Sequence, residues 1–423
     1  MNGLLAQMLC TTRSMFHVKH IHKFIHNRGE TPSPCGQNEE PAIGIPRRSP
    51  RFAGLLAFTA LAALVLVGCG GVAEAAGWSA PTRLSDGNVL IQAKPGQVRA
   101  VDPDSGTERW RYPDQAPSSG GGFGAMFRST KPDVIAGTFY AAPILDKDQI
   151  YLVSYEGGVV RLNRGDGGVS KAWITQLQEK VVATPALSGG RLYIATETGE
   201  IVVVSAADGA ITTRYRAGSG RIWGGMTVSG ENLITPNLDE RAVYALRLSD
   251  GQQAWRAPDA ASVGDVVNAG PNLLVGGIDG SLRAFDATGG GVRWRFDADG
   301  WVTTAPVVTG DTIYIGSMGG SVYALSLDGQ QRQQFTLDAE KAEFRSAPVM
   351  ANGTLVIASR RGVVVGLDPA TLQQKWRAAI NDVRIDASPL VIDGQVFLIT
   401  TKHALIRVDA SSGAHRLISA PSE

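Results

Sequence analysis

The feature that most constrains this chain is an internal repeat of about 40 residues, which runs from Gly77 to the C-terminus. Each unit ends in an aromatic residue, and successive ends are 39 to 42 residues apart except for one interval of 63. These ends are Trp110, Trp173, Tyr215, Trp255, Trp294, Phe335 and Trp376. A last unit, Asp386 to Ser419, raises the number to eight. Repeats of this length build solenoids or propellers, because one unit cannot bury its apolar face alone.

Each unit contains four short runs rich in Val, Ile and Tyr, separated by Gly or Asp turns, which is typical of antiparallel hairpin strands. Most units open with Ala-Pro or a related pair, and Pro is suited to an edge strand. Two units have Gly225-Met226 and Asp265-Val266 there instead. A ring of such sheets leaves only short edges unpaired. The sequence therefore predicts an all-β, eight-bladed β-propeller of four-stranded antiparallel blades over residues 77–423. Seven blades and an open solenoid are the alternatives.

The N-terminal segment has the pattern of an export signal. Arg47, Arg48 and Arg51 surround the start of an uncharged apolar run that ends in Leu-Val-Gly-Cys at Cys69. This pattern predicts a signal peptide over 47–68. Its ending resembles the bacterial lipobox, which implies lipidation of Cys69 and a lipidated linker over 69–76. A short membrane anchor is the alternative. Residues 1–46 are polar and suggest a disordered leader or a start codon placed too far upstream.

Composition excludes several classes of protein. Beyond residue 68 the chain has 33 basic and 36 acidic residues, so it lacks the positive charge that nucleic-acid binding requires. All three cysteines, Cys10, Cys35 and Cys69, precede the repeats, which therefore contain no disulfide and no Cys metal site. Only His403 and His415 follow the signal. We therefore predict neither a metal site nor a cofactor.

Several units share a tighter motif between the third strand and the aromatic end. Its fullest copy is Ala100, Asp102, Ser105, Gly106 and Trp110. This motif resembles the tryptophan-docking motif of the pyrroloquinoline-quinone (PQQ) type propeller family. The resemblance implies that each Trp lies flat against the next blade, burying a large ring. The implied docking residues are Trp110, Trp173, Trp255, Trp294 and Trp376. A fold of this kind does not define an activity.

Within that family, one propeller behind a lipobox resembles the BamB-type outer-membrane assembly lipoproteins. The resemblance implies a non-catalytic scaffold for protein partners, with the barrel-assembly machinery as a candidate. It would lie on the periplasmic side of the outer membrane in a Gram-negative host, and on the cell membrane otherwise. A propeller that binds a small ligand or polysaccharide is an alternative. A quinone-dependent dehydrogenase is disfavoured, because the repeats lack the Cys pair of those enzymes. We expect Asp265, Asp299 and Asp386 to cap turns near the channel.

The interval of 63 residues contains an insertion over 115–137 that is rich in Gly and carries interface-type side chains. These candidates for partner binding are Phe123, Met126, Phe127 and Arg128. A linker or a channel plug is the alternative interpretation. Arg221 and Trp223 should lie on the same face, where an exposed Trp beside Arg would form a binding hot spot; packing in the channel is equally compatible. Turn residues Asp239–Arg241, Met318, Arg360, Arg361, Lys402 and His403 should share this face.

Overall fold

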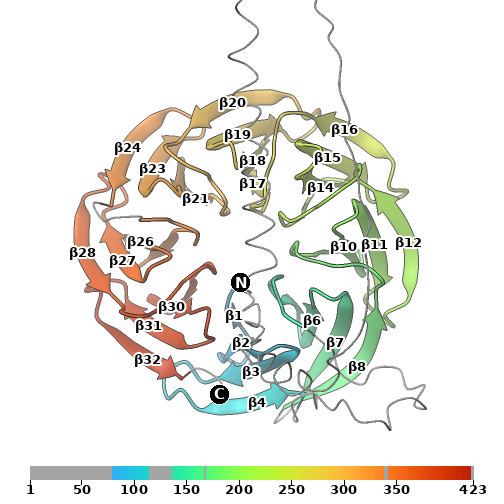
Figure 1. Cartoon of the computed structure of the whole chain (residues 1–423), viewed down its shortest axis with the longest axis horizontal. Helices are drawn as coiled ribbons and strands as arrows, with labels where there is room; N and C mark the ends of the chain where they lie inside the picture. Colours follow the sequence, from blue (N-terminus) through green and yellow to red (C-terminus); the bar gives the residue numbers. More distant parts are fainter. Residues whose placement is uncertain (1–78, 114–134, 136, 166–167, 338–341, 421–423) are drawn as a thin grey trace, which may run out of the picture. The chain divides into compact units, whose positions relative to one another are not determined.

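A computed structural model describes residues 79–113, 135, 137–165, 168–337 and 342–420. These residues form eight antiparallel sheets of four strands each, in chain order. The sheets are arranged radially as blades, with the first strand of each blade innermost and the fourth outermost (Figure 1). The prediction of an eight-bladed all-β propeller is confirmed, and the seven-bladed and solenoid alternatives are wrong. The part of the chain that is described contains no helix long and apolar enough to cross a membrane.

The first four blades take up residues 82 to 257. Blade 1 comprises β1 (Thr82–Arg83), β2 (Val89–Lys94), β3 (Gln97–Val101) and β4 (Glu108–Tyr112). Blade 2 comprises β5 (Ile144–Asp146), β6 (Gln149–Val153), β7 (Gly158–Gly165) and β8 (Gly168–Gln176). Blade 3 comprises β9 (Ala186–Ser188), β10 (Arg191–Ala195), β11 (Glu200–Ser205) and β12 (Ile211–Arg216). Blade 4 comprises β13 (Thr227–Ser229), β14 (Asn232–Asn237), β15 (Ala242–Arg247) and β16 (Gln253–Ala257).

The last four blades follow the same order. Blade 5 comprises β17 (Val267–Ala269), β18 (Asn272–Gly276), β19 (Ser281–Asp286) and β20 (Val292–Asp297). Blade 6 comprises β21 (Val307–Thr309), β22 (Thr312–Gly316), β23 (Ser321–Ser326) and β24 (Gln331–Thr336). Blade 7 comprises β25 (Val349–Ala351), β26 (Thr354–Ala358), β27 (Val363–Leu367) and β28 (Gln374–Ala379). Blade 8 comprises β29 (Leu390–Ile392), β30 (Gln395–Ile399), β31 (Leu405–Asp409) and β32 (His415–Ser419).

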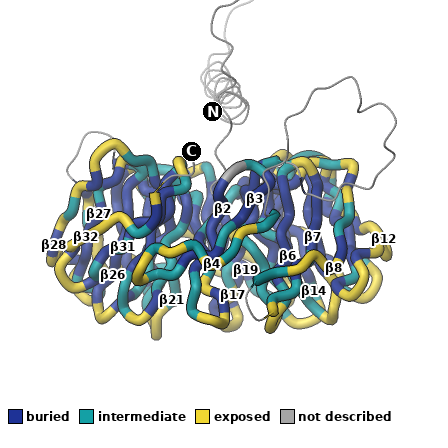
Figure 2. Tube along the Cα trace, turned by 90° about the horizontal axis from the view of Figure 1, so that it is seen from below, coloured by how far each residue is buried: buried dark blue, intermediate teal, exposed yellow. Residues whose placement is uncertain are grey.

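Burial within a blade follows from its position in the ring. The second and third strands, such as β22 and β23, are covered on both faces and are almost continuously apolar. The outermost strand has one face towards solvent, so β20 alternates between exposed and half-buried residues. The same contrast separates the buried interior from the exposed turns and outer strands (Figure 2).

The hydrophobic core is divided into eight clusters, and each cluster draws its residues from two adjacent blades. One cluster joins Tyr193 of blade 3 to Leu233 and Tyr244 of blade 4. Another joins Val89 of blade 1 to Phe397 of blade 8, so the core continues across the point where the ring closes. No blade therefore buries its faces without both neighbours.

The aromatic end of a blade packs on a turn of the next blade. Trp376 in β28 lies over Gly413, where a Cβ atom would come within 2.5 Å of the indole ring. Gly413 has a φ of +75°, so the position demands glycine for both space and backbone conformation. The indole Nε1 also donates a hydrogen bond to the Ala410 carbonyl oxygen at 2.8 Å. One side chain thus fixes the distance and the orientation of two sheets.

This contact recurs around the ring. The corresponding pairs are Trp173 with Gly209, Tyr215 with Gly251, Trp255 with Gly290 and Trp294 with Gly329. Three of these aromatic residues also donate to a carbonyl of the neighbouring blade: Trp173 to Ala206, Tyr215 to Leu248 and Trp294 to Leu327. The Nε1 atom of Trp255 is buried and has no acceptor.

Three blade interfaces depart from the pattern. Blade 6 ends in the smaller Phe335, and blade 7 has the buried Leu372 at the glycine position with a φ of +54°. Trp110 is half-buried in the cluster between blades 1 and 2, where β7 and β8 form a longer hairpin. Gly106 of blade 1 lies against the backbone of Ile418 in blade 8, which lacks an aromatic end.

The docking tryptophans offer a matched comparison. Trp376 and Trp255 are 9% and 7% exposed, but only Trp376 makes the indole hydrogen bond. We predict that Trp376→Phe lowers the free energy of unfolding by about 1 kcal/mol more than Trp255→Phe, since the latter loses no hydrogen bond. Urea denaturation of both variants measures the difference. Equal losses would show that the hydrogen bond does not contribute to docking.

Candidate functional site

One end of the ring carries both the turns between second and third strands and the connections from one blade to the next; we call it the loop face. Each connection is hydrogen-bonded to turns on both sides. Glu197 N, in the blade 3 turn, donates to the Lys180 oxygen at 3.0 Å, and Val181 N donates to the Tyr155 oxygen in the blade 2 turn at 2.9 Å. The same pairing joins Arg360 N to Glu343 O and Ile385 N to Arg360 O in blades 7 and 8. Side chains on this face are therefore presented by a rigid frame.

Side chains alternate along each connection. The central residue is buried, as Ile222, Phe344 and Ile385 are, and the residues on either side of it are the bordering positions of the loop face. These bordering residues and the adjacent turn residues form three sectors. The aromatic sector, in blades 2–4, consists of Tyr140, Tyr155, Lys180, Glu197, Arg221 and Trp223. The apolar sector, in blades 5 and 6, consists of Val263, Ile278, Trp301 and Met318. The arginine sector, in blades 7 and 8, consists of Glu343, Arg345, Arg360, Arg384 and Asp386.

The aromatic sector is a continuous network of side chains centred on Glu197. Its carboxylate accepts hydrogen bonds from Trp223 Nε1 at 2.8 Å and from the Tyr155 hydroxyl at 3.4 Å. The Lys180 ammonium lies 5.0 Å from the Tyr155 ring centroid, and the Tyr140 ring meets Tyr155 edge-on at 5.5 Å. Burial, then the charges around it, raises the pKa of Tyr155 to about 12, so its hydroxyl remains a donor. The network joins three segments of the loop face into one rigid unit.

Arg221 and Trp223 lie together, but not as an exposed pair. Trp223 is only 5% exposed, so the structure has the packed arrangement rather than the exposed hot spot. The Arg221 guanidinium stacks 5.0 Å above the Trp223 ring and forms an ion pair with Asp239. Arg221 thus covers the indole and is itself the more accessible residue, with 22% of its side chain exposed.

The apolar sector was not predicted as a unit. Val263, Ile278, Trp301 and Met318 are all half-buried, and only Met318 had been assigned to this face. Met318 N donates to the Trp301 oxygen at 2.8 Å, and Ile278 N donates to the Ala261 oxygen at 3.0 Å, which fixes these residues in adjacent blades. Aligning the connections by their distance from the Ala-Pro pair would have placed Trp301 here. Partly exposed Trp and Met side chains are typical of protein interfaces.

The remaining predicted residues are distributed over the loop face. Asp239 pairs with Arg221, and Arg361 and Lys402 are exposed at turns of blades 7 and 8. His403 is half-buried next to blade 1, where Arg99 Nη2 donates to its carbonyl oxygen at 3.4 Å. Phe123, Met126, Phe127, Arg128 and Cys69, with the leader, signal and linker over 1–76, lie outside the described residues.

Small side chains begin the inner strands along the channel, and Asp265 is the exception. Thr184, Gly225, Ala305 and Ala347 hold the corresponding positions in other blades. The Asp265 carboxylate accepts a hydrogen bond from Gly225 N at 2.8 Å. Its side chain is solvent-exposed, and the blades packed around it raise its pKa by desolvation. Asp265 thus links blades 4 and 5, and Asp299 similarly accepts from the Ser321 hydroxyl at 2.6 Å.

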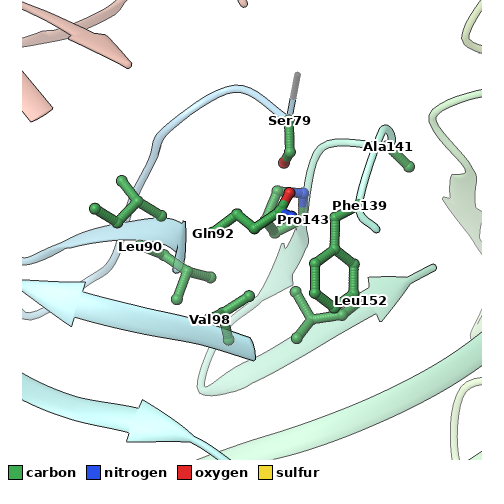
Figure 3. Close-up of a pocket in the computed structure, with 9 residues that line it drawn as sticks. Ser79, Leu90, Gln92, Val98, Phe139, Ala141, Pro143 and Leu152 are labelled. Atoms are coloured by element: carbon green, nitrogen blue, oxygen red, sulfur yellow. The ribbon is translucent and has the colours of Figure 1, made fainter. Parts of the chain in front are cut away.

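A small cavity lies between blades 1 and 2 (Figure 3). Its lining includes Gln92, Ser79, Phe139 and Pro143, and its volume is about 10 Å³. Both polar atoms of the Gln92 amide are buried without a partner. The volume suits one water molecule at most and is far below that of a small-molecule site. Among the described residues, no group of three or more His, Cys, Asp or Glu side chains could hold a metal ion.

The fold and the repeated docking contacts define this protein as an eight-bladed propeller of the PQQ-like repeat class. A family profile described as "Outer membrane protein assembly factor BamB" matches residues 70–170, 169–269 and 239–423. The chain therefore belongs to the BamB family of PQQ-like propellers.

Individual relatives are distant. The chain is 26% identical over 250 residues to the outer membrane protein assembly factor BamB of Yersinia pestis, covering 55% of this chain and 62% of the relative. With the Escherichia coli protein of the same name it shares 23% identity over 338 residues, covering 74% and 80%. It spans only 38% of the Burkholderia pseudomallei relative.

Solved structures support the fold alone. BamB from Moraxella catarrhalis superposes with a TM-score of 0.61 at 16% identity, covering 77% of this chain and 92% of that one. The computationally designed Ika8 protein superposes with a TM-score of 0.62 at 14% identity, covering 81% and 96%.

His403 should make stability depend on pH. Burial, followed by the charge of Arg99, lowers its pKa to about 4 from an ordinary value of 6.5. The folded state thus favours the neutral ring. The free energy of unfolding is therefore highest above pH 6.5 and decreases as the pH falls towards 4, because only the unfolded chain takes up the proton in this window. We predict that up to about 3 kcal/mol of unfolding free energy is lost over this window. His403→Asn, which suits the φ of +62°, should reduce this loss in urea titrations at pH 7 and 4. An unchanged pH dependence would contradict the assignment.

Proposed function

We propose that this chain is an exported, lipid-anchored scaffold in the assembly of outer-membrane β-barrel proteins. The observation that carries the proposal is the family profile, whose three matches together run from residue 70 to residue 423. The lipobox-like sequence before Cys69 supports an anchor there and a location on the periplasmic side of the outer membrane. The scaffold acts by binding protein partners and not by catalysis.

The loop face is the proposed binding surface. Its hydrogen-bonded connections hold the apolar sector rigid. Little conformational entropy is therefore lost when a partner binds there. Trp301 and Met318 offer partly exposed apolar surface, and Arg221, in the aromatic sector of the same face, offers a charged group. An apolar centre with a polar rim is the usual composition of a protein interface.

The insertion over 115–137 is proposed as a second contact. It enters blade 2 through Phe139 and Tyr140, and Tyr140 belongs to the aromatic sector. The described residues that follow the insertion thus lie on the loop face. Phe123, Met126, Phe127 and Arg128 are its candidate binding side chains.

Truncation of the apolar sector tests the proposal. We predict that the double variant Trp301→Ala, Met318→Ala recovers at least about tenfold less barrel-assembly protein from solubilised outer membranes of the host, since truncating a central Trp costs about 2 kcal/mol or more. Quantitative mass spectrometry of the captured proteins gives the measurement. Val292→Ala, which truncates a 55% exposed apolar residue on the outer strand of blade 5, is the matched control.

The two parts of the proposal fail differently. If the unmodified chain captures no barrel-assembly component, the proposed role is wrong. If capture is unchanged in the double variant while its melting temperature is preserved, the role stands but the apolar sector is not the surface.

Deletion of residues 118–128 tests the second contact separately. The described strands on either side end at Tyr112 and begin at Ile144, so we predict an unchanged melting temperature and a several-fold weaker capture in the same assay. Capture equal to that of the unmodified chain would remove the insertion from the binding surface.

A further inference from the structure

The arginine sector places three guanidinium groups on the loop face of blades 7 and 8. Arg345 and Arg384 come from consecutive connections, and Arg360 comes from the turn between them. The fold does not require a cation at these positions. The residues equivalent to Arg345 in other connections are uncharged, apart from Asp386: Tyr140, Val182, Trp223, Val263 and Thr303.

The two carboxylates of the sector are both engaged by Arg360. Its Nη1 donates to Glu343 Oε2 at 3.2 Å, and its Nε lies 3.0 Å from Asp386 Oδ1. Arg345 is left with a weaker interaction, because its Nε is 3.6 Å from Glu343 Oε2 and donates no hydrogen bond. The ion pair of Arg345 is therefore longer than either ion pair of Arg360, although Arg360 Nε and Asp386 Oδ1 also lack a hydrogen bond.

This arrangement is unfavourable without a further anion. The Arg345 side chain is only 20% exposed, and its Nε is buried without an acceptor. Burial, followed by repulsion from Arg360, lowers the Arg345 pKa. A buried charge is normally paired and hydrogen-bonded, so the position is one where a bound anion would add stability.

We propose that Arg345 binds the carboxylate of a peptide segment whose neighbouring side chains are apolar. One guanidinium whose ion pair with Glu343 is long, at 3.6 Å, matches one singly charged carboxylate, which it can contact through two parallel hydrogen bonds. The apolar sector continues directly from this point, since Phe344 N donates to the oxygen of Ser317, the residue before Met318, at 3.2 Å. This site goes beyond the proposed role in barrel assembly and does not depend on it.

Calorimetric titration of the full chain at low ionic strength tests the site. The probes are acetyl-Gly-Leu-Glu-Leu-Gly-amide and the same peptide with Gln in place of Glu. We expect the Glu peptide to bind about tenfold more tightly than the Gln peptide, as one charge-assisted hydrogen-bonded contact provides. Arg345→Gln should abolish this preference. Arg361→Gln, an exposed arginine in the same turn as Arg360, should keep it.

Two results would overturn the proposal. One is a preference for the Glu peptide that survives in Arg345→Gln. The other is inorganic phosphate binding more tightly than the Glu peptide and displacing it, which would assign the site to a different anion. If Arg345→Gln melts at a lower temperature, Arg345→Lys provides the comparison, because it keeps the charge. It should bind the Glu peptide more weakly than the unmodified chain and still prefer it to the Gln peptide.

Discussion

The whole structure depends on burial of apolar surface between adjacent blades. No blade has a core of its own, since every cluster is shared by two blades, and the aromatic end of one sheet rests on the backbone of a turn in the next. Trp376 over Gly413 shows why this contact is specific: the ring needs a glycine beneath it and a carbonyl at its edge. Stability is therefore a property of the closed ring, in which each interface supports its two neighbours.

Ring closure relies on side chains rather than on a shared sheet. Blade 1 is built entirely from β1–β4 and blade 8 entirely from β29–β32, so no strand is exchanged between the chain ends. The interface also lacks an aromatic end. A shared apolar cluster and arginine contacts take the place of a shared sheet and a docking aromatic. Arg99 Nη2 donates to the Ala420 oxygen at 2.8 Å, and Arg407 forms an ion pair with Asp104 at 2.8 Å. The contact of Arg407 is exposed and contributes little alone, so the apolar cluster must provide most of the closure.

The repeat spacing was sufficient to predict the blades, because an aromatic residue recurs near the end of the first seven sheets at intervals close to 40 residues, apart from one of 63. It could not predict how individual interfaces adapt. Tyr215 lies two residues beyond the usual Trp position, opposite Ile201, and still covers Gly251. Phe335 and Leu372 show a compensating exchange, in which a smaller ring accompanies a larger residue in the turn. At the candidate site, burial of Trp223 beneath Arg221 depends on Glu197 from another blade, and such distant contacts have no signal in a single repeat.

The loop face is free to carry function because main-chain hydrogen bonds recur in every connection, whereas its side-chain contacts differ from blade to blade. The connections are fixed by main-chain hydrogen bonds to the turns and by one buried residue each, such as Phe344. The bordering positions can therefore vary from blade to blade, and they do so in sectors: aromatic, apolar and arginine-rich. On the outermost strands the side chains are constrained instead, because the residues of one face must pack on the next blade. A binding surface that must differ around a repetitive ring is thus expected at the channel mouth, where the repeat imposes geometry but not chemistry.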